Sequence, residues 1–225
     1  DQYLCVRALS DLLKGGENIV VDGGGTNVYI TFQGFKVKPD QRVMLTSSLG
    51  AMGSGLPEAL GAYFANGRPT ICLVGDGSFM LNVQELSTIR RHNIPMKIFV
   101  FNNGGYVSIR ETQSGFLGAR FAGSSEEGGL HLPSFTKVAE AFEIPAMAIT
   151  DRSRVASEMA KFLAWDGPGL CEIVLSPLQA VRPRQNFAAR PDGTNVAMPL
   201  DQMFPPLPDD TLRTLSPWTV GAGRG

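Results

Sequence analysis

The protein has 225 residues, of which 43% are hydrophobic and 18% are charged, and its formal net charge is −1. This length suits one α/β domain, or one domain with an extended tail. The near-neutral charge provides no basic surface for a nucleic acid, and no apolar run reaches the roughly 18 residues of a membrane span. We therefore expect neither a nucleic-acid nor a membrane partner.

Apolar spacing predicts helices and strands that alternate along the chain. In chain order the predicted elements are a helix over 2–14, a strand over 18–22, a glycine-rich opening and helix over 50–66, a strand over 70–76, a helix over 80–92, a strand over 96–103, a helix over 134–142 with Ser134 as N-cap, a strand over 146–150, a helix over 153–165 and a strand over 169–175. The alternation is typical of an α/β fold, a parallel sheet flanked by helices on both faces. Ligands bind such sheets beyond the carboxyl ends of the strands, where the loops after 18–22, 70–76 and 96–103 meet.

Two regions interrupt the alternation. Residues 114–133 form a predicted long loop with five glycines, and loops of this length are usually functional or disordered. From Ser176 onward the chain is rich in proline and largely without periodicity. We predict one domain over residues 1–180 and an extended tail over 181–225 that packs on the domain or on a partner.

The three cysteines, Cys5, Cys72 and Cys171, are far apart and lie in apolar surroundings. They lack the spacing of metal ligands, so we expect buried, reduced thiols in a cytoplasmic protein. The two histidines, His92 and His131, stand in unrelated contexts. We therefore expect neither a zinc site nor a histidine-centred triad.

Asp76 follows an apolar strand and stands between two glycines. Gly77 and Ser78 then lead toward the start of a helix, where free N–H groups favour an anion. A carboxylate beside an anion is repulsive unless a divalent cation lies between them. Mg²⁺ suits this arrangement because it takes few protein ligands and completes its coordination with phosphate oxygens.

A second polar loop, Asn102-Asn103-Gly104-Gly105, follows the next strand. Asn103 offers an amide oxygen, and Gly105 offers a backbone carbonyl that no side chain obstructs. Each loop taken alone is equally consistent with an ordinary turn. However, the 24 residues over 78–101 correspond to one helix and one return strand, which brings both loops to the same sheet edge.

Gly-Asp-Gly, 24 residues and Asn-Asn together resemble the thiamine diphosphate-binding motif of thiamine-dependent enzymes. The segments over 47–65, 85–106 and 190–208 resemble acetolactate synthases and related decarboxylases. The resemblance covers nearly the whole chain and implies the diphosphate-binding domain of such an enzyme, with the thiamine diphosphate-binding fold.

The resemblance implies a role for each matching residue. Asp76 and Asn103 would be side-chain ligands of Mg²⁺, and the Gly105 carbonyl would be a third. The diphosphate would contact Gly77, Ser78 and the loop of Gly25 and Thr26. Met52, the candidate catalytic residue, would bend the thiamine, although its position also suits an ordinary core methionine. The full set of candidate cofactor-binding residues is Gly25, Thr26, Gly50, Met52, Gly75, Asp76, Gly77, Ser78, Asn103, Gly105 and Tyr106.

Two positions depart from acetolactate synthases, which usually have Gln-His where this chain has Gly25-Thr26, and a tryptophan in place of Thr112. The departures leave open a different 2-oxo acid, or a bulkier acceptor such as a keto sugar or a cyclic ketone. Arg110, Glu111 and Gln113, which follow the Asn102-Asn103-Gly104-Gly105 loop, are expected to border the substrate. Glu85 is expected to be a solvated surface residue.

The family carries an activating glutamate on a separate pyrimidine-binding domain, and the sequence contains no second α/β domain. It also begins at Asp1 rather than Met. We therefore expect that domain to come from another chain or from another part of the same polypeptide, in a homo- or hetero-oligomer. A flavin on a further domain stays open.

Three hypotheses follow. The first is the catalytic part of a thiamine diphosphate- and Mg²⁺-dependent lyase or carboligase acting on a 2-oxo acid. The second is a non-catalytic cofactor-binding or regulatory module of the same fold. The third is another kind of nucleotide-binding α/β domain, although the chain lacks both G-x-x-x-x-G-K-[ST] and a G-x-G-x-x-G after its first strand.

Overall fold

The structure is a computed structural model, and it describes residues 1–46, 48–199 and 202–215. The chain divides into two compact units, Asp1–Gln179 and Ala180–Gly225.

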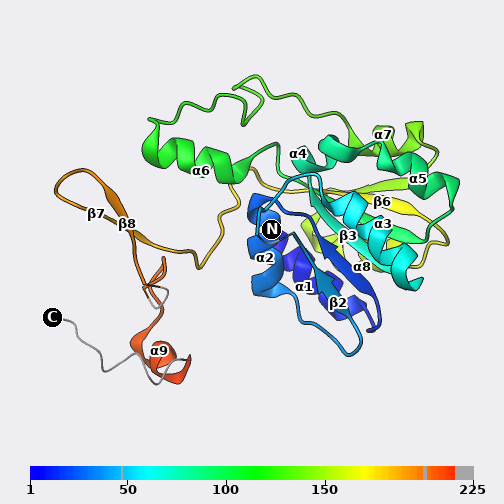
Figure 1. Cartoon of the computed structure of the whole chain (residues 1–225), viewed down its shortest axis with the longest axis horizontal. Helices are drawn as coiled ribbons and strands as arrows, with labels where there is room; N and C mark the ends of the chain where they lie inside the picture. The colour runs from blue at the N-terminus through cyan, green and yellow to red at the C-terminus, as the bar shows by residue number, and fades with distance from the viewer. Residues whose placement is uncertain (47, 200–201, 216–225) are drawn as a thin grey trace. The chain divides into compact units, whose positions relative to one another are not determined.

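The first unit is built on a six-stranded sheet with the strand order β2-β1-β3-β4-β6-β5 (Figure 1). Its strands are β1 (Asn18–Val21), β2 (Arg42–Met44), β3 (Thr70–Gly75), β4 (Met96–Asn102), β5 (Ala146–Ile149) and β6 (Gly169–Val174). All neighbouring strands are parallel, which confirms the predicted α/β fold. Because β1, β3 and β4 are adjacent, the loops that follow them lie together at one edge.

Helices cover both faces of this sheet (Figure 1). The helices of this unit are α1 (Gln2–Leu12), α2 (Gly25–Gly34), α3 (Gly55–Asn66), α4 (Asp76–Phe79), α5 (Glu85–Arg91), α6 (Val107–Phe116), α7 (Phe135–Ala141) and α8 (Val155–Leu163), with short 3-10 helices η1 (Met80–Asn82) and η2 (Arg152–Arg154). Of these, α6 contacts α2 more than it contacts any strand of the sheet. Leu86 of α5 and Phe135 of α7 are buried in one cluster with Val74. On the opposite face, Phe162 of α8 contacts Phe99 edge-on, with ring centroids 5.1 Å apart. The alternation of side chains along β3 and β4 thus supplies a core on each side.

Among the elements of the first unit, α2, β2, α4 and α6 were not predicted. In α2, the run Val28-Tyr29-Ile30-Thr31-Phe32 consists of β-branched and aromatic residues that favour strands. Tertiary contacts override this propensity, because the buried Asn27 side chain at the start of α2 donates to the Leu73 carbonyl at 2.8 Å. The predicted loop over 114–133 accordingly begins inside α6.

The predicted single helix over 80–92 is divided into η1 and α5, with α4 in front of it. Val83 and Gln84 keep right-handed helical angles. However, the N–H of Leu86 bonds to the Val83 carbonyl, in the i to i+3 pattern of a tighter turn. The chain therefore keeps its helical direction while the hydrogen-bond pattern changes. Ser134 does cap α7, as predicted, by accepting from the Lys137 N–H.

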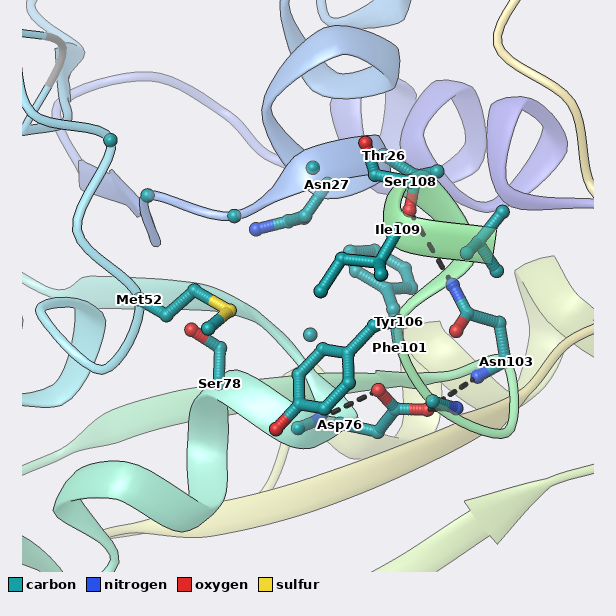
Figure 2. Close-up of a pocket in the computed structure, with 18 residues that line it drawn as sticks. Thr26, Asn27, Met52, Asp76, Ser78, Phe101, Asn103, Tyr106, Ser108 and Ile109 are labelled. Carbon is teal, nitrogen blue, oxygen red and sulfur yellow. Dashed lines mark hydrogen bonds between the residues drawn. The ribbon is translucent and has the colours of Figure 1, made fainter. Parts of the chain in front are cut away.

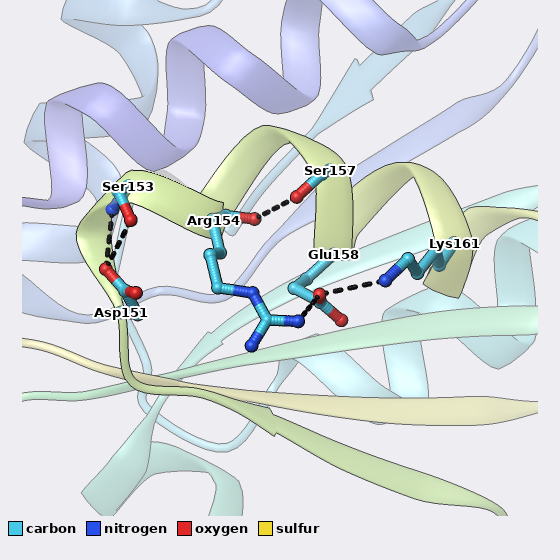
Figure 3. Close-up of polar contacts among 6 residues, drawn as sticks. All are labelled: Asp151, Ser153, Arg154, Ser157, Glu158 and Lys161. Carbon is cyan, nitrogen blue, oxygen red and sulfur yellow. Dashed lines mark hydrogen bonds and ion pairs between the residues drawn. The ribbon is translucent and has the colours of Figure 1, made fainter.

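Side-chain oxygens organise the region where α8 begins (Figure 3). Asp151 accepts hydrogen bonds from both the N–H and the hydroxyl of Ser153, each at 2.8 Å. Glu158 pairs with Arg154 at 2.5 Å and with Lys161 at 3.0 Å. These groups face solvent, where ion pairs contribute little to stability, so they orient the helix more than they stabilise the fold.

The second unit has an antiparallel pair, β7 (Phe187–Ala189) and β8 (Asn195–Ala197), followed by α9 (Asp209–Leu215). The Arg182 guanidinium lies 4.6 Å from the centroid of the Phe204 ring, a cation–π contact. Residues 200, 201 and 216–225 of the predicted tail, and residue 47 of the segment over 47–65, lie outside the described residues.

The three cysteines are free and buried, as predicted. Burial raises the pKa of the Cys5 thiol to about 11 and that of Cys171 to about 12, so both are protonated and unreactive at neutral pH. Within the described residues, no helix is both long and apolar enough to cross a membrane.

Candidate cofactor site

A pocket of about 240 Å³ opens at the carboxyl ends of β1, β3 and β4 (Figure 2). Every residue predicted to bind the cofactor lines it: Gly25, Thr26, Gly50, Met52, Gly75, Asp76, Gly77, Ser78, Asn103, Gly105 and Tyr106. The sequence reasoning missed the remaining lining residues: Gly23, Gly24, Asn27, Phe101, Val107, Ser108 and Ile109. Four segments of the chain, at residues 23–27, 50–52, 75–78 and 101–109, therefore line one pocket.

Asp76 begins α4 and is buried, with its carboxylate facing backbone N–H groups. One oxygen accepts from the Gly77 N–H at 2.6 Å, and the other accepts from Asn103 at 3.0 Å and from Gly105 at 2.9 Å. Burial raises the pKa of Asp76, and these N–H groups oppose the rise. The carboxylate thus joins the two polar loops directly.

Asn103 has a buried side-chain oxygen without a protein partner. Its Nδ2 donates to the Thr26 hydroxyl at 3.4 Å, whereas Oδ1 has no hydrogen-bond partner among the described residues. A buried acceptor left unsatisfied costs free energy, and a cation would satisfy it. Asp76 stands beside it, so a carboxylate and an amide oxygen together fit the oxygen donors that Mg²⁺ requires.

The Gly105 position admits no side chain. Its φ is +121°, in the region that favours glycine, and an added Cβ would lie 2.6 Å from both Leu130 Cδ2 and the Ser124 carbonyl oxygen. The Gly105 carbonyl accepts from the Val107 N–H at 3.2 Å. A carbonyl oxygen has two lone pairs, so this one keeps capacity for a metal.

Gly77 and Ser78 lie under the wall of the pocket that Tyr106 forms. A Cβ on Gly77 would lie 2.3 Å from the Tyr106 ring, so a larger residue at this position would displace that ring. The Ser78 hydroxyl accepts from the Gly53 N–H at 2.8 Å. It therefore also supports the turn that carries Met52.

Met52 is not an ordinary core methionine. Its side chain is 43% exposed and lines the pocket, against the glycine loop after β1: a Cβ on Gly24 would lie 3.6 Å from Met52 Cγ. A large apolar side chain exposed inside a pocket is available to contact a ligand. Gly25, at the start of α2, is close to α6, since its Cβ would lie 3.0 Å from Ser108 Cβ.

Two acids near the pocket, the buried Asp22 and the partly buried Glu58, were not predicted. Asp22, which directly follows β1, is fully buried. Its Oδ1 accepts from the Gly55 N–H at 2.6 Å, whereas its Oδ2 has no hydrogen-bond partner among the described residues. Burial raises the pKa of Asp22, and the nearby Ser78 hydroxyl opposes the rise. Burial also raises the pKa of Glu58, and the charge of Asp22 adds to this effect. In the sequence, Asp22 could have been found only as a lone aspartate at the end of the apolar run Ile19-Val20-Val21.

The predicted substrate-bordering residues do not line the pocket. Arg110 and Gln113 are engaged with the backbone: Gln113 donates to the Ala122 carbonyl, and Arg110 donates to several carbonyls. Glu111 is exposed on α6. Glu85 is partly buried and accepts from the Thr88 hydroxyl at 3.3 Å, which corrects its expected exposure.

Comparisons with known proteins agree with this geometry. The family described as "Thiamine pyrophosphate enzyme, C-terminal TPP binding domain" matches residues 23–173. Acetolactate synthase 2, chloroplastic, of Zea mays is 36% identical over 187 residues, which are 81% of this chain and 29% of that protein. The acetolactate synthase isozyme 2 large subunit of Escherichia coli (strain K12) is 34% identical over 181 residues, 80% of this chain and 32% of that protein.

The fold and the pocket define a domain that binds thiamine pyrophosphate. The chain belongs to the thiamine pyrophosphate enzyme family, as its C-terminal TPP-binding domain, and is acetolactate synthase-like. It spans about a third or less of the length of these relatives. This membership decides against another kind of nucleotide-binding domain.

Proposed function

We propose that this chain is the catalytic, cofactor-holding part of a thiamine diphosphate- and Mg²⁺-dependent lyase or carboligase that acts on a 2-oxo acid. The observation that carries the proposal is the buried Asn103 Oδ1, an acceptor without a partner among the described residues, on the residue whose N–H donates to Asp76. A bound cation explains why such an atom is buried.

Different pocket residues would bind the metal and the diphosphate. Asp76, Asn103 and the Gly105 carbonyl would hold Mg²⁺. Gly77 and Ser78, which line the pocket beside Asp76, would contact the diphosphate. When bound, thiamine diphosphate supplies a carbon nucleophile for the 2-oxo group and accepts the electrons that decarboxylation releases.

The opposite side of the pocket would hold the organic part of the cofactor. Met52, whose side chain is exposed inside the pocket, would contact the thiamine. Gly50 lines the pocket at the base of the same turn, where its backbone is open to the aminopyrimidine. Gly25 and Thr26, at the start of α2, would complete the diphosphate site.

The other half of the active site would come from a pyrimidine-binding domain. That domain would supply the glutamate that activates the aminopyrimidine, from another subunit or from another part of the same polypeptide. The greater length of the relatives supports this arrangement. The segment after residue 180 is proposed to pack on the domain or on that partner.

We also propose a 2-oxo acid different from that of acetolactate synthases, or a bulkier carbonyl acceptor, because Thr112 stands where those enzymes usually have a tryptophan. Ile109 lines the pocket, and Thr112 follows it on α6 as an exposed residue whose hydroxyl donates to the Ser108 carbonyl at 3.2 Å. A short side chain at this position leaves room that an aromatic ring would occupy. A screen of 2-oxo acids against ketone acceptors tests this choice.

Cofactor analysis of the purified assembly tests the proposal itself. Thiamine diphosphate and Mg²⁺ released on denaturation would support it. Cofactor without turnover of any 2-oxo acid would favour the alternative, a non-catalytic binding or regulatory module. Absence of both from protein prepared with excess cofactor would contradict the proposal and the alternative together.

Asp76→Ala tests the metal ligands. Loss of a metal's outer-shell partners typically costs about 10- to 100-fold in affinity, so loss of a ligand is expected to lower Mg²⁺-dependent cofactor retention by at least about 100-fold. Retention is measured as thiamine remaining after dialysis against Mg²⁺. Asp11→Ala, on the exposed face of α1, is the control. Retention unchanged in Asp76→Ala would show that the ligand assignment is wrong.

A further inference from the structure

The loop over 102–106, which we call the metal loop, joins β4 to α6 and has its peptide groups fixed by partners on two sides. On one side, the N–H groups of Asn103 and Gly105 donate to Asp76 at 3.0 and 2.9 Å. On the other side, the Gly104 carbonyl accepts from Arg110 Nη1 at 3.1 Å. A trans peptide group is planar, and its C=O and N–H point in opposite directions. The Arg110 bond to Gly104 and the Asp76 bond to Gly105 are therefore the two ends of one peptide plane.

Arg110 binds further carbonyls with the same guanidinium. Its partners are Ser124 at 2.8 Å, Pro177 at 3.2 Å and Asn103 at 3.3 Å, in addition to Gly104. No ion pair joins it to a carboxylate among the described residues. A guanidinium has five N–H donors in a rigid planar fork. These donors are largely committed to the backbone, which leaves little capacity for a substrate.

The Ser124 carbonyl links Arg110 to the peptide group between Gly105 and Tyr106. It accepts from Arg110 and also from the Tyr106 N–H at 3.1 Å. The Tyr106 N–H and the Gly105 carbonyl belong to one peptide plane, so fixing the first orients the second. Arg110 thereby acts on the carbonyl that would be the third metal ligand, although it does not touch the metal position itself.

We propose that Arg110 is the positioning residue of the metal loop: it orients the peptide groups that present the Gly105 carbonyl to Mg²⁺ and the Gly105 N–H to Asp76. The inference rests on the proposed function, because it assigns Mg²⁺ to this loop. Arg110 touches neither cofactor nor substrate and acts through the backbone.

The same contacts couple the metal loop to the segment over 121–130. The fully buried Ser124 is held by Arg110 through its carbonyl and by Gln113 through its hydroxyl, at 2.5 Å. The Gly123 N–H closes this segment on the Gly128 carbonyl at 2.8 Å. Loss of Arg110 should therefore loosen the segment as well as the metal loop.

The test compares Arg110→Ala and Arg110→Lys with Glu111→Gln, an exposed neighbour on α6, in the complete assembly with its partner domain. Mg²⁺ is titrated at saturating thiamine diphosphate, and retained thiamine is measured after dialysis. Arg110→Ala is expected to raise the Mg²⁺ concentration for half-maximal retention at least tenfold, and Arg110→Lys by less. Glu111→Gln should match the wild type.

Two further measurements separate positioning from general stability. Guanidinium ion at low millimolar concentration, well below denaturing levels, should restore much of the Mg²⁺ affinity of Arg110→Ala, whereas methylammonium should not. Trypsin should cleave after the exposed Arg120 faster in Arg110→Ala than in Glu111→Gln, with Mg²⁺ and thiamine diphosphate present.

The outcomes distinguish the two proposals. If the wild type retains no thiamine diphosphate at any Mg²⁺ concentration, the proposed function fails. If the wild type retains it and the Arg110 variants need the same Mg²⁺ within twofold, the role of Arg110 is overturned. Failure of both Arg110 variants to fold would also overturn it, because Arg110 would then be a residue of the fold rather than of the metal loop.

Discussion

At the scale of single residues, the buried carboxylates of the first unit differ in what surrounds them. Asp76 accepts three backbone N–H groups and stands beside the Asn103 side-chain oxygen, which has no partner among the described residues, so a cation has a place there. Asp22 is equally enclosed, but its neighbour Glu58 is a second acid. The first arrangement suits a metal, whereas in the second burial raises the pKa of Asp22 and so disfavours its charged form.

Asp22→Asn is expected to change how stability depends on pH. The pKa of Asp22 is raised in the folded protein, so the native state binds this proton more tightly than the unfolded chain. Stability is then lost as the pH rises from the unfolded pKa to the raised folded pKa, at about 1.4 kcal/mol for each unit of difference. Asparagine keeps the acceptor for Gly55 and carries no charge.

The measurement for Asp22→Asn is Tm between pH 4 and 8, with Asp11→Asn as the exposed control. The Tm of the variant should rise relative to that of the wild type as the pH rises, and this difference should level off above the raised pKa of Asp22. A Tm difference that stays constant across this range would show that Asp22 does not gain its proton on folding.

At the scale of elements, the path from β3 to β4 shows where periodicity succeeds and where it fails. Leu86 and Ile89 of α5 are fully buried, as their spacing predicted. The break at Val83 and Gln84 was not predicted, because the cause is distant: Asn82 donates to the Gly53 carbonyl at 2.7 Å. One side chain thus ties this path to the turn that carries Met52.

Leu86→Ala tests the packing of α5. The side chain is fully buried between α5 and the sheet, so truncation is expected to cost about 2–5 kcal/mol of unfolding free energy. Leu81→Ala on the neighbouring η1, where the leucine is 52% exposed, should cost less than about 1.5 kcal/mol. Urea denaturation of both variants measures the difference, and equal losses would contradict the assigned packing.

At the scale of the whole molecule, this chain is proposed to hold half of an active site. It carries the groups that fit a diphosphate and its metal, and it covers 29% and 32% of two relatives. An activating glutamate is assigned to the other half, so the cofactor bound to this chain alone would lack its activating group.

Residues 1–225 alone are therefore expected to bind thiamine diphosphate with Mg²⁺ and to show no turnover of 2-oxo acids. Decarboxylation is assayed with and without the partner domain, and cofactor content is measured in parallel. Robust turnover by this chain alone would show that it contains its own activating group.

The sequence by itself determined the α/β fold and eleven of the eighteen residues that line the pocket. Asp76 and Asn103 were found together because each ends a strand, and the carboxyl ends of parallel neighbours share one edge. The tertiary structure alone decided which polar groups are left for a ligand. Asn103 Oδ1 has no partner among the described residues, whereas the Ser78 hydroxyl is bound to Gly53 and Arg110 is bound to the carbonyl of Pro177. Backbone carbonyls are the same in every residue, so a side chain that binds them at long range leaves no mark in the sequence.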